Sequence, residues 1–171
     1  KKFGYPVFNA DLIVSNLYKK DKKIFINLKK KLPNYFNKFP VDKKNVCDAI
    51  LGNKNNLKKI IKIIHLEVKK KMSLFLKKNK NKKIVILDIP LLLENKINKK
   101  NDILIFVQSK KNDIFKRLIK RKNYNKKLVS IFRNIQLPLD YKKKQSQFII
   151  KNNFSKKSVS KDVKKIIKEI Y

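Results

Sequence analysis

Short apolar runs alternate along the chain with longer stretches in which apolar residues recur every three or four positions. The short runs predict β-strands and the longer stretches predict helices, because side chains repeat every two residues in a strand and every 3.6 in a helix. Strands that alternate with helices favour an α/β fold with a parallel sheet covered on both faces. The four predicted strands are residues 5–8, 84–88, 103–107 and 148–150.

The run IVILDIPLLLEN at 84–95 predicts the central strand and the loop that follows it. Its first four residues are apolar, which is typical of a strand buried on both faces. Asp88 ends this strand, and ligands of open α/β sheets bind beyond the carboxyl ends of the strands. Two roles for Asp88 stay open: a site carboxylate, or the cap of a helix that begins at the leucine triplet.

Asp11 follows the first predicted strand, just before an apolar helical start. An aspartate at this place can cap the helix, because its oxygens accept hydrogen bonds from the first helical N–H groups. It can also act as a catalytic base or a metal contact at the mouth of a sheet. On the residues alone, the cap is the simpler interpretation.

Residues 15–80 hold no strand pattern and are predicted to be mostly helical, as an insertion beside the sheet. Apolar side chains recur at helical spacing from Leu57 to Phe75, which predicts one long amphipathic helix. His65 lies at the edge of this apolar stripe, where a histidine is more often a core-edge residue than a catalyst. Breaks are expected at Pro33, Pro40 and Gly52.

A helix at 113–122 is predicted to carry Arg117 and Arg121 on one face, because the two residues stand four apart. Guanidinium groups are well suited to clamping phosphate. An ion pair between Asp113 and Arg117 is the alternative. The apolar residues expected to face inward from this helix are Ile114, Phe115, Leu118 and Ile119.

Two further helices are predicted after Arg121. One covers residues 128–136 and is followed by a break at Pro138. The other covers the C-terminus, where apolar residues recur at helical spacing from Val159 to Ile170. Its cap is expected at Ser158 or Ser160.

The formal net charge of +35 favours either nucleic-acid binding or a genome-wide bias toward A- and T-rich codons. Lysine, asparagine and isoleucine are abundant together, and only three of the 47 basic residues are arginine. Arginine is the preferred residue for bidentate contacts to phosphate and guanine. The lysines also spread along the whole chain, so we favour codon bias, with a non-specific affinity for polyanions as a side effect.

Several classes of protein are disfavoured by composition. One cysteine, Cys47, excludes an internal disulfide framework and fits a reducing cytoplasm. A single histidine beside a single cysteine makes a structural zinc site a poor hypothesis. No apolar run approaches the ~20 residues that span a membrane, and no signal peptide is recognised.

Six segments in order resemble motifs of the dephospho-coenzyme A kinase family of P-loop kinases. They read FGYPVFNAD at 3–11, IIH at 63–65, DIPLLLEN at 88–95, IFKRLIKR at 114–121, QLPLDYK at 136–142 and FIIKNN at 148–153. The resemblance implies a three-layer α/β fold with a parallel central sheet, a helical substrate-binding insertion and a lid. It also implies one domain over residues 1–171, in which about 15–80 bind substrate, 84–107 hold core strands, about 110–145 form the lid, and 147–171 form the last strand and helix.

The resemblance further implies a reaction: transfer of the γ-phosphoryl group of ATP, with Mg²⁺, to the ribose 3′-hydroxyl of dephospho-CoA. Asp11 would be the catalytic residue. The substrate pocket would be lined by His65, Pro90, Leu91, Leu92 and Glu94. The ATP and lid residues would be Arg117, Arg121, Lys142 and Asn152.

The chain departs from the family pattern at several positions. The Gly-rich phosphate loop that ends in Gly-Lys-Ser/Thr is absent, although it normally cradles the ATP phosphates and holds magnesium. The match starts where this loop would have ended, so we expect an N-terminally truncated piece that is inactive without it. Other departures from the family pattern are Asn9 for aspartate, Leu66 for proline, and Gln147 and Lys151 where acidic residues are common.

Two rival functions stay open. One is another small-molecule P-loop kinase, such as a nucleoside monophosphate kinase, which the order of the motif segments disfavours. The other is a basic nucleic-acid-binding protein, which predicts lysines gathered on one face. The expected partners are dephospho-CoA and ATP, without a specific nucleic acid or a membrane, in the cytoplasm.

Overall fold

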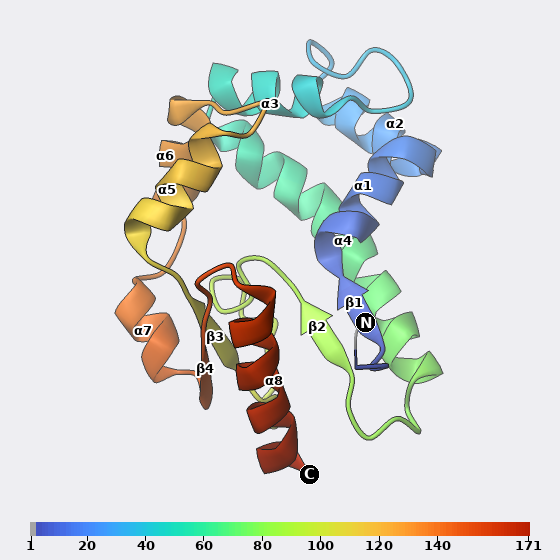
Figure 1. Cartoon of the computed structure of the whole chain (residues 1–171). Coiled ribbons are helices and arrows are strands. Elements are labelled where there is room, and N and C mark those ends of the chain that lie inside the picture. Colours follow the sequence, from blue (N-terminus) through green and yellow to red (C-terminus); the bar gives the residue numbers. More distant parts are fainter. Residues whose placement is uncertain (1–2) are drawn as a thin grey trace. The chain divides into compact units, whose positions relative to one another are not determined.

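The computed structural model describes residues 3–171 (Figure 1). Within this range the chain forms four strands and eight helices. The strands are β1 (Val7–Asn9), β2 (Ile86–Asp88), β3 (Ile105–Gln108) and β4 (Phe148–Lys151). The helices are α1 (Ala10–Lys20), α2 (Lys22–Lys31), α3 (Lys43–Gly52), α4 (Asn55–Lys78), α5 (Lys111–Ile119), α6 (Lys126–Asn134), α7 (Leu139–Lys144) and α8 (Lys156–Ile170).

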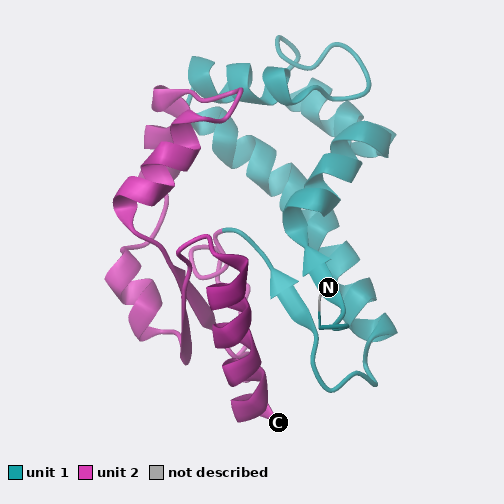
Figure 2. Cartoon of the chain, in the orientation of Figure 1, with its two compact units in different colours: residues 1–90 teal, residues 91–171 magenta. Residues whose placement is uncertain are grey.

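The chain divides into two compact units, residues 1–90 and residues 91–171 (Figure 2). Each unit contains one pair of parallel strands: β1 with β2 in unit 1, and β3 with β4 in unit 2. The predicted α/β class with parallel strands is therefore confirmed. The assignment of all 171 residues to one domain stays a prediction.

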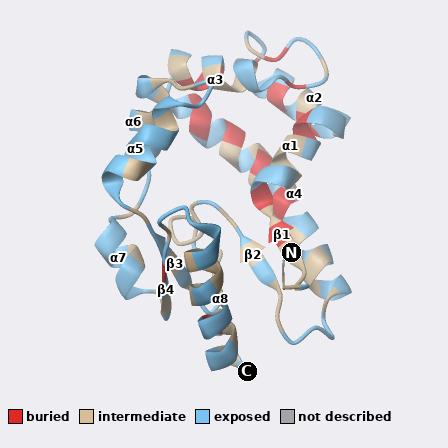
Figure 3. Cartoon of the chain, viewed as in Figure 1, coloured by how far each residue is buried: buried red, intermediate tan, exposed pale blue. Residues whose placement is uncertain are grey.

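Unit 1 has the larger core, built where α4 packs against α1, α2 and α3. Buried residues follow one side of α4 and recur on the other helices of this unit (Figure 3). Leu28 of α2 and Phe36, in the loop after it, are completely buried at 0% exposure. The long helix and the mostly helical block at 15–80 are thus confirmed.

Unit 2 is organised around the β3–β4 pair, with α8 packed against β4. Ile150 of β4 and Ile166 of α8 are its buried apolar residues among those that the structure describes. The small core follows from the short strands, because two paired strands of four residues can bury few side chains.

Three predictions of burial are wrong. Ile86 of β2 is 38% exposed and Val107 of β3 is 56% exposed, so neither strand is buried on both faces. Each lies in a two-stranded sheet, whose strands have one hydrogen-bonded neighbour instead of two. The apolar side of α5 is also open, because the close packing of unit 2 joins β3, β4 and α8. Its exposed residues include Ile114, Phe115 and Ile119.

Helix starts also differ from the predictions. Asp11 does not cap α1, because the helix begins at Ala10 and Asn9 holds the cap position. The cap position of α8 is Ser155, and not Ser158 or Ser160. The leucine triplet forms turns in place of a helix, and Leu91 has a φ of 56°, a left-handed backbone conformation outside the α-helix. Asp88 therefore caps no helix there.

None of the helices within residues 3–171 combines the length and the apolarity that a membrane crossing requires.

We expect the core of unit 1 to be much more sensitive to truncation than its surface. Leu28→Ala should lower the free energy of unfolding by about 3 kcal/mol, because it leaves a cavity among fully buried side chains. Leu74→Ala on α4 is the matched control, since Leu74 is 64% exposed and its loss should cost under about 0.5 kcal/mol. Urea denaturation measures both, and equal losses would contradict the position of the core.

Candidate active site

The parallel register of β1 and β2 brings two polar side chains together at the carboxyl ends of these strands. Asn9 and Asp88 are the last residues of their strands and stand opposite each other. The Asn9 Nδ2 donates a hydrogen bond to Asp88 Oδ2 at 2.6 Å. This is the sheet edge at which open α/β folds bind ligands.

Asn9 also starts α1. Its Oδ1 accepts a hydrogen bond from the backbone N–H of Leu12 at 2.8 Å, as an N-cap residue does. Both contacts require the same orientation of the amide, with nitrogen toward Asp88 and oxygen toward the helix. Asp11 therefore lies in the first turn of α1, exposed to solvent, where the helix dipole favours a negative charge.

His65 lies on α4 and is half-buried. Burial lowers the pKa of its imidazole, and the positive charge of Lys69 lowers this pKa further. Both effects disfavour the cation, so His65 is a neutral hydrogen-bonding group at neutral pH.

In the loop after β2, the exposed Pro90 is followed by a sharp turn at Leu91. The Leu91 carbonyl accepts hydrogen bonds from both the backbone N–H and the side-chain amide of Asn95, at 3.0 and 2.8 Å. The loop is thus closed on itself, with Leu92 half-buried inside the turn segment.

Glu94 joins this loop to the QLPLDYK segment. Its side chain is only 9% exposed. The Glu94 Oε1 accepts hydrogen bonds from the Leu137 backbone N–H and from the Lys142 Nζ, each at 3.0 Å. The Lys142 Nζ also lies 3.4 Å from the Gln136 Oε1. Two motif segments that are far apart in the sequence are therefore held together by a largely buried ion pair.

The pKa of Glu94 reflects this environment. Burial by itself would raise the pKa, because it disfavours the carboxylate. Hydrogen bonds from the backbone N–H groups of Glu94 and Leu137 and from the Lys142 side chain outweigh burial, so the pKa of Glu94 lies below its usual value. The group is ionised whenever the protein is near neutral pH.

A third group of residues lies around the turn after β4. The Asn152 backbone N–H donates to the Gln108 carbonyl at 2.7 Å, and its Oδ1 accepts from the Phe154 N–H at 2.9 Å. Phe154 has a φ of 64°, and the Arg117 guanidinium lies over its ring at 4.3 Å from the centroid. Arg117 and Asn152 are thus brought into one neighbourhood through Phe154.

Arg121 lies outside this arrangement. Helix α5 ends at Ile119, and the backbone N–H of Arg121 bonds to the Leu118 carbonyl in a turn. The predicted helical face shared by Arg117 and Arg121 is therefore wrong, because the helix stops before the second arginine.

A family model described as "Dephospho-CoA kinase" matches residues 1–158. The chain belongs to the dephospho-CoA kinase family. The predicted family is therefore confirmed, and with it the class of enzyme.

Two curated relatives show the same match over nearly the whole chain. The dephospho-CoA kinase of Wolbachia sp. subsp. Brugia malayi is 33% identical over 169 residues, which cover 98% of this chain and 86% of the relative. The enzyme of the same name from Wolbachia pipientis wMel is 32% identical with the same coverage.

Two solved structures share the fold. TT1252 from Thermus thermophilus has a TM-score of 0.74 and 20% identity, covering 99% of this chain and 87% of its own. Dephospho-CoA kinase from Campylobacter jejuni has a TM-score of 0.65 and 21% identity, covering 99% of this chain and 86% of its own. The α/β kinase fold predicted from the sequence is confirmed by these likenesses.

Sequence reasoning about this dephospho-CoA kinase family member missed two features of the site. The first is the role of Asn9, which was visible only as a departure from the family's aspartate. The second is Phe154, which follows the last motif segment and carries no signal in the sequence pattern. Both act through contacts between residues far apart in the chain.

We expect the Glu94–Lys142 pair to stabilise unit 2. Lys142→Met should lower the free energy of unfolding by about 1.5–3 kcal/mol at pH 7, because it leaves the carboxylate largely buried without its cation. Lys143→Met is the matched control, since Lys143 is exposed on the same helix and should have almost no effect. Urea denaturation checks both variants.

The same pair predicts a pH dependence. A carboxyl group with a lowered pKa in the folded protein stabilises it above the unfolded pKa of about 4.3, and this contribution is lost as the pH falls through the folded pKa. The stability difference between wild type and Glu94→Gln should therefore be full at pH 7 and shrink below about pH 4. A difference that is independent of pH would contradict an ionised Glu94.

We expect His65 to titrate below the usual value of about 6.5. It is the single histidine of the chain, so its ring resonances can be followed by NMR without ambiguity. Lys69→Met should raise the pKa, because it removes a nearby positive charge. Lys71→Met on the same helix is the control, and an equal shift in both variants would exclude a specific effect of Lys69.

Proposed function

We propose that this chain transfers the γ-phosphoryl group of ATP to the ribose 3′-hydroxyl of dephospho-CoA, which gives coenzyme A. The observation that carries this function is the match of residues 1–158 to the dephospho-CoA kinase family. The two Wolbachia relatives, which carry the same name, support it over 98% of the chain. Another kind of P-loop kinase is not favoured by these matches.

Asp11 is the residue that we propose at the reacting hydroxyl. Phosphoryl transfer passes through a loose transition state, so positioning and charge neutralisation supply most of the rate. Asp11 is exposed in the first turn of α1, beyond the end of β1, where a substrate can reach it. The proposed role of Asp11 is mainly to orient the attacking hydroxyl.

Arg117 and Arg121 are proposed to close on the phosphates of ATP, from a lid that contains α5 and α6. Arg117 rests on the Phe154 ring. An exposed cation–π contact is worth about 0.5–1 kcal/mol, and a hydrogen bond to a charged group about 1.5–3 kcal/mol. Phosphate can therefore draw the guanidinium away from the ring, while Asn152 is proposed near the adenine of the same ATP.

His65 and the loop at 90–94 are each proposed to contact dephospho-CoA. His65 offers a neutral imidazole, which can donate or accept a hydrogen bond without adding charge. Pro90, Leu91 and Leu92 offer apolar surface. Glu94 is engaged by Lys142, so we propose that it contributes by holding this loop in place.

Magnesium is proposed as the ion that accompanies ATP. Mg²⁺ is bound by oxygen ligands, typically one or two carboxylates together with substrate phosphates. Among the described residues, no group of three or more acidic, histidine or cysteine side chains could hold a metal ion. Asp11 would be its protein ligand, and the bound ion would neutralise the developing phosphate charge.

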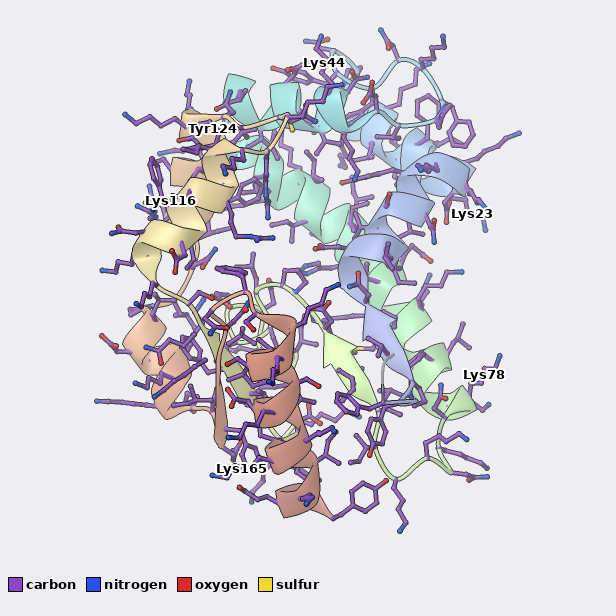
Figure 4. All side chains as sticks on the ribbon, viewed as in Figure 1. Lys23, Lys44, Lys78, Lys116, Tyr124 and Lys165 are labelled. Atoms are coloured by element: carbon purple, nitrogen blue, oxygen red, sulfur yellow. The ribbon has the colours of Figure 1, made fainter. Side chains whose placement is uncertain are left out.

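The lysines are proposed to have no specific nucleic-acid partner. Figure 4 labels exposed lysines on five different helices, all pointing away from the ribbon: Lys23, Lys44, Lys78, Lys116 and Lys165. A dispersed charge of this kind supports weak, salt-sensitive attraction to polyanions, without sequence preference. The cytoplasmic location also stays a prediction.

A substrate panel tests the proposed function. The protein expressed from its complete gene should phosphorylate dephospho-CoA and not nucleoside monophosphates. Asp11→Asn should lower kcat at least 100-fold with little change in KM, because the group acts in the transition state. Asp48→Asn, an exposed aspartate on α3, is the matched control and should keep full activity. Phosphorylation of a nucleotide in place of dephospho-CoA would overturn the assignment.

A further inference from the structure

We propose that Lys142 is a positioning residue for dephospho-CoA, which acts through Glu94 and contacts neither substrate. Glu94 lies in the leucine loop, residues 91–97, whose Leu91 and Leu92 are proposed above to contact dephospho-CoA. The inference rests on that proposed function. It deepens the function by assigning Lys142 to the dephospho-CoA side of the reaction, whereas the family resemblance places this lysine with ATP and the lid.

The leucine loop keeps its shape through bonds between its own members. The Leu91 carbonyl accepts two hydrogen bonds from Asn95, and the Leu92 carbonyl accepts one from the Ile97 N–H at 3.1 Å. Leu91 and Lys96 have φ angles of 56° and 49°, a conformation that side chains larger than glycine keep only where their surroundings hold it. These internal bonds close the loop, but they do not determine where it lies in unit 2.

Glu94 attaches the leucine loop to a distant part of unit 2. Its Oε1 accepts hydrogen bonds from the Leu137 N–H and the Lys142 Nζ, across 43 and 48 positions of sequence. The Glu94 side chain is only 9% exposed, so both contacts are shielded from water. The position of the loop therefore depends on a carboxylate that stays buried.

Lys142 is itself firmly held. Its carbonyl accepts a hydrogen bond from the Ser146 Oγ at 2.9 Å, at the end of α7. The next residue, Gln147, joins the β3–β4 pair: its N–H donates to the Leu104 carbonyl at 3.0 Å, and its Oε1 accepts from the Leu104 N–H at 2.7 Å. The cation that meets Glu94 is thus carried by backbone tied to the sheet of unit 2.

The ammonium group of Lys142 is engaged by protein groups. Its Nζ lies 3.0 Å from the Glu94 Oε1 and 3.4 Å from the Gln136 Oε1, and 19% of the side chain is exposed. Phosphate binding by a lysine needs an ammonium group that the phosphate can reach. The contacts of Lys142 favour a role within the protein over a role at the phosphates of ATP.

A carboxylate buried this deeply needs its cation. Removal of one partner from a buried ion pair leaves the other charge uncompensated in the interior. Without the lysine, the Glu94 carboxylate would turn toward water or take up a proton, and either change weakens its bond to the Leu137 N–H. The leucine loop would then open locally while the rest of unit 2 stays folded, and Leu91 and Leu92 would lose their positions.

The proposed ATP residues are held by different contacts. Arg117 lies over the Phe154 ring, and the Asn152 Oδ1 accepts a hydrogen bond from the Phe154 N–H. None of these contacts involves Glu94 or Lys142. Loss of the ion pair should therefore weaken the binding of dephospho-CoA selectively.

The experiment measures kcat and both KM values, with the protein expressed from its complete gene. The variants are Lys142→Met and the double variant Glu94→Gln/Lys142→Met. Lys143→Met is the matched control, because it removes the same charge from an exposed position on the same helix. The midpoint of thermal unfolding is measured alongside, so that a loss of stability is separated from a loss of binding.

We expect Lys142→Met to raise the KM for dephospho-CoA about tenfold, with kcat and the KM for ATP within about twofold of wild type. The double variant should return the KM for dephospho-CoA to within about threefold of wild type, because glutamine has no charge to bury and its amide oxygen still accepts from Leu137. Lys143→Met should have the constants of wild type. Recovery in the double variant is the result that a direct substrate contact does not produce.

Three results would overturn the positioning role. The first is an unchanged KM for dephospho-CoA in Lys142→Met, whatever its thermal midpoint. The second is a rise in the KM for ATP, which would assign Lys142 to ATP. The third is a double variant as impaired as Lys142→Met, because the lysine would then act without Glu94. If Lys142→Met fails to fold, the double variant still decides, since it also lacks the lysine and should bind both substrates nearly as wild type does.

The wild-type protein separates this inference from the function on which it rests. A wild type that does not phosphorylate dephospho-CoA would overturn the proposed function, and the positioning role with it. A wild type that does so, together with any of the three results above, would overturn the positioning role alone.

Discussion

The constraint on which unit 1 depends is the parallel register of two very short strands. β1 and β2 have three residues each, and their pairing ends both at the same level. A shift of one residue would turn every side chain to the opposite face of the sheet. The contact between Asn9 and Asp88, the start of α1 and the place of Asp11 all follow from this one register.

Much of the fold could be predicted because local pattern determines it. The long α4, with Leu57, Ile60 and Ile64 on its buried side, follows from helical spacing, and β4 falls within one residue of its predicted range. The family could be recognised because six short motifs kept their order. Helical spacing and motif order can both be read from a single sequence, because neither depends on which distant segments are in contact.

Burial could not be predicted from the same patterns. An apolar run such as that of β2 predicts a strand, but its burial depends on how many neighbours the strand has. Ile114 and Phe115 form an apolar stripe on α5, and the helix still leaves them exposed. The predicted helix caps were wrong for a related reason. Several neighbouring residues are suitable as an N-cap: Asn9 and Asp11 for α1, and Ser155 and Ser158 for α8. The exact turn at which each helix begins decides which of them is the cap.

The candidate site was predicted as a set of residues, and the structure shows which of them interact. Glu94 and Lys142 were placed in different roles by their motifs, yet they form one ion pair. Arg117 was expected beside Arg121 and lies instead over Phe154. These contacts join residues more than 35 positions apart, a separation at which neither periodicity nor motif spacing carries a signal.

The Glu94–Lys142 pair has a consequence for how the segment between its ends can vary in length. The chain leaves the neighbourhood of Glu94, passes through β3, α5 and α6, and returns to Lys142, 48 positions later. The ion pair and the pairing of β3 with β4 hold the two ends of this segment together. Added residues in its loops should lower the stability of the fold only slightly, because doubling the length of a flexible loop raises its closure free energy by only about 0.6 kcal/mol. The fold should therefore tolerate insertions between Arg121 and α6. Changes in the spacing from Gln136 to Lys142, which sets the geometry around Glu94, should not be tolerated.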